Sequence, residues 1–312
     1  MLAFLLRRAL GLVFVLFGVL TLTFIVGHLA PGDPVLTIMG QRHDPALYHR
    51  LRHVYGLDQP LWQQYLAYIG GVLHGNFGIS YHYTDTPVST LLLRDTPATL
   101  QLGIPALLLG PLLGVPLGIL AATRQGKPAY TVSTGLALLL YSIPTFVLAP
   151  LLLAIDISLY NSGYPSLPVA GWGTLSEAVL PILVLAAPNV AYLARLTRTS
   201  LLGVLHEDYI RTARAKGLKG RIIIGRHALR LALLPVVTFL GPSLALIITG
   251  TFVVENIFNI PGIGFAVVNS IFTRDYPLMQ ALAIVLAASV VIMNTLTDVI
   301  YSMLDPRIEL AA

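Results

Sequence analysis

The sequence lacks cysteine and has little charge. Its 312 residues include no Cys, two Trp and only 11% charged residues, whereas 56% are hydrophobic, and the mean hydropathy is +0.79. Without cysteine the chain has no disulfide, thiolate metal site or cysteine nucleophile. Soluble globular chains carry about 25% charged residues, so this composition excludes a cytosolic enzyme, a disordered chain and a nucleic-acid-binding protein. It indicates a protein of the lipid bilayer.

Six apolar stretches are long enough to cross a bilayer, whose core of about 30 Å needs about 20 helical residues. The first stretch is longer than the apolar core of a signal peptide, about 7–15 residues, and Pro31 directly follows it. We therefore expect it to be retained as a span. The predicted spans are 9–30, 100–122, 130–155, 178–196, 233–254 and 279–301.

Most of the 19 Lys and Arg residues fall in segments that face the cytoplasm if the N-terminus is inside. Basic residues in short loops mark the cytoplasmic side, so both termini are predicted to be cytoplasmic. The expected fold is an all-α, six-span membrane protein. It divides into an N-terminal segment and span at 1–30, an extracytoplasmic loop at 31–97, and a five-span core at 98–312. The core includes a cytoplasmic loop at 199–232.

Glycine and proline are frequent inside the spans. Gly110, Gly114 and Gly118 recur at every fourth position of the second span, a spacing that lets another helix backbone approach closely. Prolines in the second, third and fourth spans require neighbouring groups to satisfy the carbonyls that they free. The pattern predicts a bundle of bent, closely packed helices.

The outer loop carries two amphipathic helical patterns. One begins at Asp44, and the other follows Asp58 and Pro60, a predicted cap and first-turn pair. The aromatic residues of the second pattern predict a helix along the outer membrane surface. His49 and His53 lie four residues apart on the first helix, a spacing that suits a metal. Because a third ligand is missing, we interpret them as a solvated polar face and expect no metal site.

The cytoplasmic loop contains a short, sharply bounded helix pattern. Glu207 and Asp208 lie where a helix dipole favours acids, and Lys216 lies where it favours bases. Gly217 suits the left-handed residue that ends a helix. A second basic helix is expected over 219–232. A helix this short needs a surface to dock against, and its two alanines, expected to be exposed, favour a protein groove over lipid headgroups.

Catalysis is not favoured by any motif. Ile210 occupies the position where a zinc-protease helix starting at His206 would need its second histidine. No G-x-S-x-G elbow and no G-x-x-x-x-G-K-[ST] phosphate-binding loop occurs, so energy must come from another polypeptide or an ion gradient. The alternative of another class is an ion-coupled secondary transporter, which would bury ionisable residues in its spans. Asp298 is the clear example here, and we interpret it as pairing with a neighbouring helix.

Glu255 ends the fifth span, just before the turn Pro261-Gly-Ile-Gly264. Two interpretations stand. In one, Glu255 contributes with Pro261, Gly262 and Gly264 to an outer gate or to a substrate path, where it meets an amino group of the substrate. In the other, it forms a structural ion pair with Arg274.

The segment Arg211-Thr-Ala-Arg-Ala-Lys-Gly217, with His227-Ala-Leu-Arg230 and Leu234-Pro235, resembles the coupling loop of ABC-transporter permeases in the dipeptide, oligopeptide and nickel importer family. Other family-like segments follow in order along nearly the whole chain: Ala30-Pro-Gly-Asp-Pro34, Tyr55-Gly-Leu-Asp-Gln-Pro60, Phe77-Gly-Ile-Ser80, Pro261-Gly-Ile-Gly264, Arg274-Asp-Tyr-Pro277 and Asp305-Pro-Arg307. The chain departs from the family at Arg211-Thr-Ala213, where the wider pattern begins Glu-Ala-Ala, and at Asn76 and Leu231, which leaves substrate choice open.

The resemblance implies a type I importer permease of the bacterial inner membrane, a transport subunit and not an enzyme, forming half of a pathway for di- or oligopeptides. Nickel, glutathione and muropeptides are alternative cargoes. The implied partners are a homologous second permease, two ATPase subunits that bind ATP and Mg²⁺, and an extracytoplasmic substrate-binding protein; no cofactor is implied in this chain. The short cytoplasmic helix would enter an ATPase cleft, where a side chain larger than Ala213 should clash. The implied contact residues are Glu207, Asp208, Tyr209, Arg211, Thr212, Ala213, Arg214, Ala215, Lys216 and Gly217.

Overall fold

The computed structural model describes residues 2–29, 33–39, 44–83, 85–126 and 128–304. The Asp305-Pro-Arg307 segment and the side chain of Asp298 lie outside this description. Within it the chain is helical, with one isolated β-bridge between Ile79 and Pro87 and no strand. The elements are α1 Leu2–Leu29, α2 Pro34–Met39, α3 Pro45–Val54, α4 Leu61–Leu73, α5 Val88–Thr123, α6 Pro128–Ser142, α7 Thr145–Asn161, α8 Leu175–Leu205, α9 Asp208–Ala215, α10 Gly220–Ile222, the π-helix η1 Ile223–Ala228, α11 Leu229–Ala232, α12 Leu234–Phe258, α13 Ile263–Phe272 and α14 Tyr276–Leu304.

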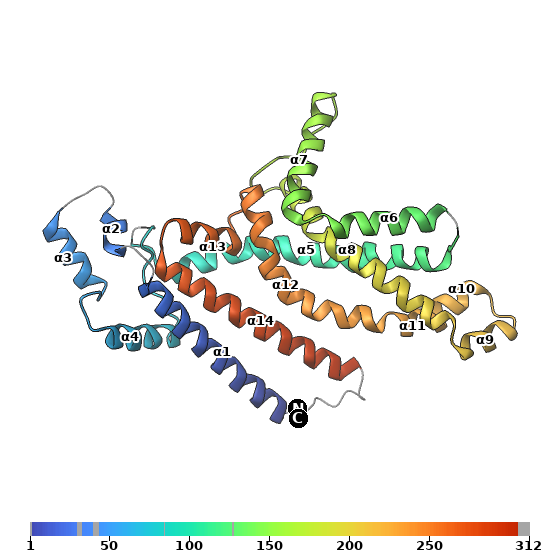
Figure 1. The fold of residues 1–312 in the computed structure, drawn as a ribbon, viewed down its shortest axis with the longest axis horizontal. Helices are drawn as coiled ribbons and strands as arrows, with labels where there is room; N and C mark the ends of the chain where they lie inside the picture. Colours follow the sequence, from blue (N-terminus) through green and yellow to red (C-terminus); the bar gives the residue numbers. More distant parts are fainter. Residues whose placement is uncertain (1, 30–32, 40–43, 84, 127, 305–312) are drawn as a thin grey trace.

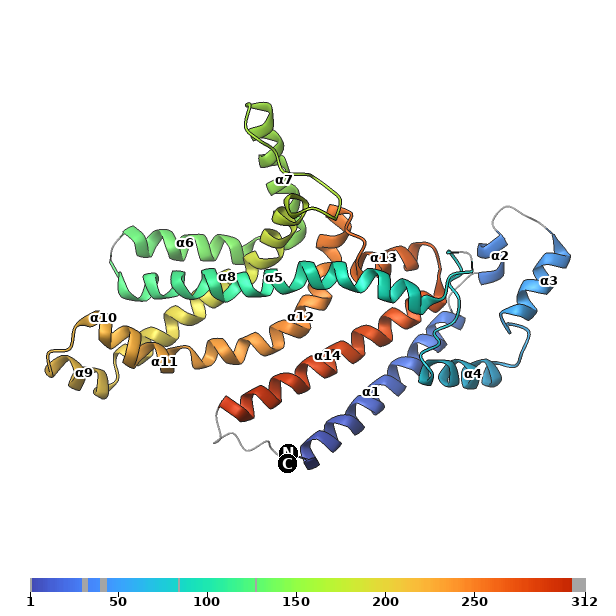
Figure 2. The ribbon, with the colours of Figure 1, turned by 180° about the vertical axis from the view of Figure 1, so that it is seen from behind.

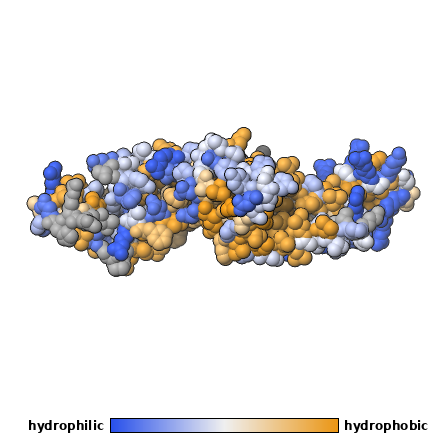
Figure 3. Space-filling view, turned by 90° about the horizontal axis from the view of Figure 1, so that it is seen from above, coloured by the Kyte–Doolittle hydropathy of each residue, from blue (hydrophilic) through white to orange (hydrophobic). Residues whose placement is uncertain are grey.

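The long helices α1, α5, α8, α12 and α14 run between two ends of an elongated molecule (Figures 1 and 2). Helices α2–α4 lie at one end, and α9 and α10 lie at the other. The first turn of α1 and the last turn of α14 both point toward the end that holds α9, as expected if both termini are cytoplasmic. Figure 3 shows hydrophobic residues over the middle of the molecule and strongly hydrophilic ones gathered toward the ends. This distribution fits a body that crosses a bilayer.

Four helices among the described residues are long and apolar enough to cross a membrane, or up to 7 spans if each of three bent helix pairs counts as one. The six predicted spans fall within this range. The second span starts earlier than expected, because α5 already begins at Val88. Helix α8, which contains the fourth predicted span, begins at a capping box. The Glu177 carboxylate accepts a hydrogen bond from the Thr174 amide over 2.8 Å, and the Glu177 amide donates to the Thr174 hydroxyl over 3.4 Å.

The glycines of α5 form its contact with α8, the most extensive helix pair in the structure. A Cβ built on Gly114 would lie 2.7 Å from the Val190 carbonyl oxygen, and one on Gly118 would lie 2.5 Å from the Ala194 carbonyl oxygen. Both distances are too short for a real carbon contact, so only glycine lets the two backbones approach this far. The predicted close packing at these glycines is confirmed.

The third predicted span, 130–155, is not continuous. It divides into α6 and α7, which are bent by 113° relative to each other, and the far end of α7 projects away from the other long helices (Figures 1 and 2). The break lies at Pro144, which is the N-cap residue of α7 and has an extended ψ of 145°. Proline has no amide hydrogen to continue the helix, and it restricts the residue before it to extended conformations. The predicted bending of this span at its prolines is therefore confirmed, and at Pro144 the bend divides the span into two helices.

Candidate functional site

Helix α9 is the short cytoplasmic-loop helix that the sequence predicts. Glu207 is its N-cap residue, although the Glu207 side chain makes no capping hydrogen bond. At the other end Gly217 has a φ of 77°, and its amide donates to the Arg214 carbonyl over 2.9 Å. Residues other than glycine adopt this left-handed conformation at a cost. The predicted glycine stop is therefore confirmed, and the second helix follows as α10, η1 and α11.

One face of α9 packs against the protein itself. Ile210 is fully buried and Ala213 is only 8% exposed. Both belong to an inner cluster that joins α9 to the cytoplasmic ends of α5 and α8 and to the segment 220–232; its other members are Ala122, Leu201, Ile223, Ala228 and Ala232. The expectation that Ala213 is exposed is wrong, because positions three apart share a helix face and Ile210 directs that face inward.

The other residues of α9 and its flanks are exposed: Glu207, Asp208, Tyr209, Arg211, Thr212, Arg214, Ala215, Lys216 and Gly217. Arg211 pairs with Asp208 over 3.3 Å. Partial burial, followed by the charge of Glu207, raises the pKa of Tyr209, so this phenol is a neutral hydrogen-bond donor at physiological pH. The outward face of α9 is therefore polar and of mixed charge, with Ala215 as its small side chain.

Glu255 is fully buried near the outer end of α12. Its carboxylate accepts hydrogen bonds from the Thr99 hydroxyl and the Phe265 amide, each over 2.8 Å. The Thr99 hydroxyl accepts in turn from the Ile263 amide over 2.8 Å. The first turn of a helix offers unpaired amides and the positive end of its dipole. Glu255 therefore fastens the start of α13 to α12 and α5.

Two glycines permit this contact, Gly262 as the N-cap residue of α13 and Gly264 in its first turn. A Cβ on Gly262 would lie 2.5 Å from Glu255 Oε2, and one on Gly264 would lie 2.6 Å from the Phe252 Cα. Both positions are closed to a larger residue by groups that are themselves packed. The turn that starts at Pro261 thus lets α13 fold back against the end of α12, from which it is bent by 76°.

The ion pair of Glu255 with Arg274 is not formed among the described residues, since α5 and α13 supply the partners of Glu255. The neighbouring Asp275 is the buried anchor of this region. It accepts hydrogen bonds from the Ser80 hydroxyl and, over 3.1 Å, from the Tyr81 amide. These contacts attach the end of the outer loop to the start of α14.

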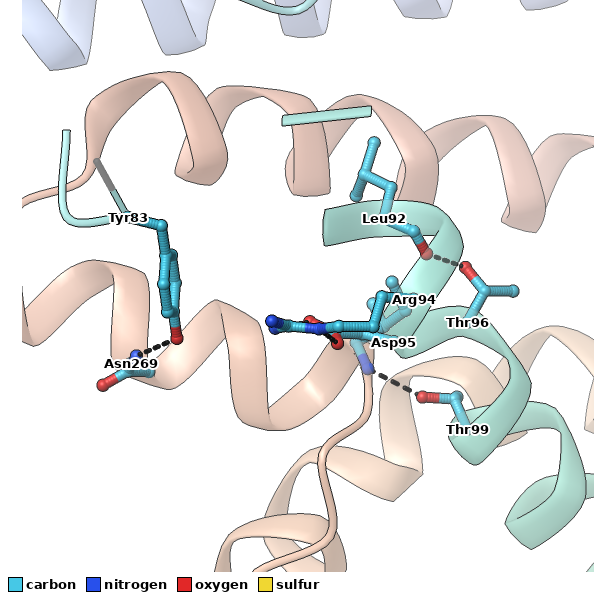
Figure 4. Close-up of polar contacts among 8 residues, drawn as sticks. Tyr83, Leu92, Arg94, Asp95, Thr96, Thr99 and Asn269 are labelled. Carbon is cyan, nitrogen blue, oxygen red and sulfur yellow. Dashed lines mark hydrogen bonds and ion pairs between the residues drawn. The ribbon is translucent and has the colours of Figure 1, made fainter. Parts of the chain in front are cut away.

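A second buried acid lies nearby on α5. Asp95 is 4% exposed and pairs with Arg94 over 2.7 Å. The Arg94 guanidinium carbon lies 5.5 Å from the centre of the Tyr83 ring, and Tyr83 meets Asn269 of α13 (Figure 4). The outer ends of α5, α12 and α13 are thus joined by hydrogen bonds. These contacts, the Arg94–Asp95 ion pair within α5 and the contacts of Asp275 form the outer network.

Sequence reasoning missed three residues of this outer network, Thr99, Asp95 and Asp275. For the two acids a signal exists, because a carboxylate beside an apolar run must find a partner when it is buried. Their partners could not be found this way, since Ser80 and Asp275 are 195 positions apart. Thr99 carries no signal, because threonine is ordinary in a membrane helix.

The histidines of the outer loop are placed differently from each other. His53 bonds Asp58 over 2.7 Å, which raises the pKa of His53 and lowers the pKa of Asp58. His49 meets Tyr48 edge to face. The predicted capping by Asp58 is wrong, since the N-cap of α4 is Pro60, without a side-chain bond. The part of the chain that the structure describes holds no group of three potential metal ligands.

We expect Glu255→Gln to destabilise the protein by about 1–3 kcal/mol. Glutamine has one acceptor oxygen where the carboxylate has two, so a buried donor of Thr99 or Phe265 loses its partner. Thr99→Val should act in the same direction, whereas Thr99→Ser keeps the hydroxyl and should be milder. Thermal unfolding of the purified chain in detergent measures this. An unchanged midpoint for Glu255→Gln would contradict a fastening role.

Family models match most of the chain. A model described as "Binding-protein-dependent transport system inner membrane component" matches residues 114–310, and its N-terminal companion matches residues 1–103. The chain therefore belongs to the family of binding-protein-dependent transport system inner membrane components. It is a multi-pass transport subunit of the bacterial inner membrane.

Individual relatives are similar over their whole length. The oligopeptide transport system permease protein OppB of Escherichia coli K12 is 42% identical over 313 residues, which cover 99% of this chain and 100% of the relative. The dipeptide transport system permease proteins DppB of Lactococcus lactis and E. coli K12 are 37% and 38% identical, with 99% of this chain covered in each case. All three relatives are permeases of transport systems.

Solved structures share the fold. The permease fold of the MetNI methionine ABC transporter, in an inward-facing conformation, matches with a TM-score of 0.57 at 19% identity, covering 69% of this chain and 96% of that chain. An amino acid ABC transporter matches with a TM-score of 0.54 at 18% identity, covering 70% and 95%. The chain has the fold of type I ABC importer permeases, as its sequence predicts.

Proposed function

We propose that this chain forms half of a translocation pathway for di- and oligopeptides in an ATP-driven importer. The observation that carries the substrate class is the end-to-end similarity to dipeptide and oligopeptide permeases of two bacteria. Energy comes from partner subunits, because the chain has no phosphate-binding loop. Those partners are two ATPase subunits with ATP and Mg²⁺, a homologous second permease and an extracytoplasmic substrate-binding protein.

The exposed face of α9 is the proposed contact with an ATPase subunit. Its buried face supports the transmission of motion, because Ile210 and Ala213 tie α9 to α5, α8 and the segment 220–232 through the inner cluster. A displacement of α9 is then passed to several spans at once, since packed interiors transmit strain. The segment 220–232 continues into α12, whose outer end carries Glu255. Helix α12 thereby links the ATPase contact to the outer network, where the loop 31–97 faces the binding protein.

The test is transport by the full complex, with the second permease, the ATPases and the binding protein, in proteoliposomes. We expect uptake of labelled di- and tripeptides that requires ATP and Mg²⁺ on the α9 side and is unaffected by an ionophore. Nickel and glutathione serve as competing cargoes. Uptake of nickel or glutathione that peptides do not inhibit would replace di- and oligopeptides as the proposed substrate class. Ionophore-sensitive uptake without ATP would identify a secondary transporter.

A further inference from the structure

A pocket of about 160 Å³ lies between α6 and the cytoplasmic halves of α5 and α8. It belongs neither to the α9 surface nor to the outer network. Since a liquid water molecule occupies about 30 Å³, the pocket is large enough for a polyatomic group. Leu117 of α5 and Ala137 and Leu138 of α6 form its apolar wall, and Arg195 and Arg198 of α8 form its charged side.

Two polar atoms of the pocket are available to hydrogen-bond a ligand. The Arg198 Nε and the Thr134 Oγ1 are buried and have no hydrogen-bond partner, although both residues line the pocket. The Arg198 Nη2 donates a hydrogen bond to the Tyr130 hydroxyl over 3.0 Å. Among the described residues, neither Arg195 nor Arg198 forms an ion pair. A buried donor without a partner, such as the Arg198 Nε, is costly, and two arginines three positions apart on α8 that form no ion pair favour an anion.

Aromatic rings hold both guanidinium groups in place. The Arg198 guanidinium carbon lies 5.0 Å from the centre of the Tyr130 ring, and that of Arg195 lies 5.0 Å from Tyr141 and 5.9 Å from Tyr192. Stacking restrains the planar guanidinium while its N–H edges remain available. A phosphate group accepts hydrogen bonds from such an edge with good geometry.

The depth of the pocket identifies the source of the phosphate. A helix rises about 1.5 Å per residue, so Arg195 lies about 30 Å along α8 from its outer start at Leu175, near the cytoplasmic boundary of a bilayer core. Leu138 and Leu139 of α6 are 58% and 55% exposed beside the pocket, which gives an apolar surface for acyl chains. We propose that this pocket binds the phosphate of an anionic phospholipid from the inner leaflet, with Arg198, Arg195 and Thr134 as its ligands.

Basic pockets between membrane helices on the cytoplasmic side are suited to anionic headgroups. Free phosphate shares the recognition chemistry, but it would make no use of the apolar wall. The inference concerns a lipid site of this chain and does not depend on which substrate the transporter carries.

The test uses the full chain purified with its partner subunits and stripped of lipid, with binding of phosphatidylglycerol measured by native mass spectrometry. We expect Arg198→Gln to weaken binding about tenfold or more and Thr134→Val to weaken it about fivefold, the scale of one charged and one neutral hydrogen bond. Arg226→Gln removes an exposed charge of η1 on the same side and should change binding less than about twofold. Thermal unfolding of each variant shows that it is folded.

Four outcomes would overturn the proposal. They are unchanged binding by Arg198→Gln, equal losses in Arg198→Gln and Arg226→Gln, equal affinity for zwitterionic phosphatidylcholine, and displacement of the lipid by millimolar orthophosphate. Equal losses would indicate general surface charge, and displacement would indicate a free-phosphate site. Because Thr134→Val leaves the charge unchanged, a loss in this folded variant supports the pocket even if Arg198→Gln fails to fold.

Discussion

Replacing Gly118 by valine should prevent the protein from reaching its native helix packing. A Cβ at this position would lie 2.5 Å from the Ala194 carbonyl oxygen and 2.6 Å from the Thr197 Cβ, so α5 and α8 must separate. Overpacking of a tight contact costs about 1–3 kcal/mol and sometimes more, and here the obstacle includes backbone, which cannot rotate away. We expect a loss of about 3 kcal/mol or more. The measurement is the yield of monodisperse protein in detergent and its thermal midpoint.

Gly135 of α6 provides a matched control. It also lies in a membrane helix, but a Cβ there has no atom within 4 Å. Gly135→Val should therefore retain a near-native yield, which separates the loss of a close contact from any general effect of valine in a span. If Gly118→Val were as stable as Gly135→Val, α5 and α8 could not be as close as the structure places them.

The α5–α8 contact was predictable because the information is local. Gly110, Gly114 and Gly118 lie on one face of any helix that contains them, so the spacing itself defines a strip for a close neighbour. What the spacing could not identify was the neighbour. That α8 fills this role, with Val190 and Ala194 opposite the glycines, depends on how all the helices pack.

Bending at Pro144 was predictable, but that the bend is a complete break between α6 and α7 was not predictable from the same kind of signal. Pro144 interrupts an apolar run just as Pro105 and Pro111 do, yet α5 continues through all four of its prolines. A proline removes one backbone donor in either case. Whether the helix continues depends on the packing around it, and here α7 packs against α8 and α12 after the bend, which hydrophobicity alone does not reveal.

Helix α9 contains both a feature that the sequence predicts correctly and one that it does not. Its ends were predictable, since charge near the termini and a glycine at 217 have local physical causes. The orientation of Ala213 was also open to inference, because Ile210 three residues earlier marks an apolar face, but the small size of alanine suggested an exposed groove contact instead. Glu255 differs again: its burial and its bond to Thr99, 156 positions away, are products of the tertiary fold.

Substitutions at the two alanines of α9 test the docking of α9 on the ATPase separately from the folding of the chain. Ala215 is exposed, so Ala215→Trp should leave the chain folded while its bulk keeps α9 out of the proposed ATPase cleft. We expect ATP-driven uptake to fall at least about tenfold, equivalent to about 1.4 kcal/mol, with less ATPase subunit recovered on co-purification. Normal uptake would mean that the exposed face of α9 does not contact the ATPase.

Ala213→Trp should also lower uptake, but because the chain itself loses stability. Ala213 lies inside the inner cluster, 8% exposed, so a tryptophan there must displace Leu201 or Ile210 at a cost of about 1–3 kcal/mol or more. This variant should lose thermal stability before any partner is added, whereas Ala215→Trp should not. If both variants melted like the unaltered chain and both lost uptake, both alanines would face the ATPase, and α9 would be rotated so that Ala213 leaves the inner cluster. The two melting curves therefore decide which side of the helix is available to a partner.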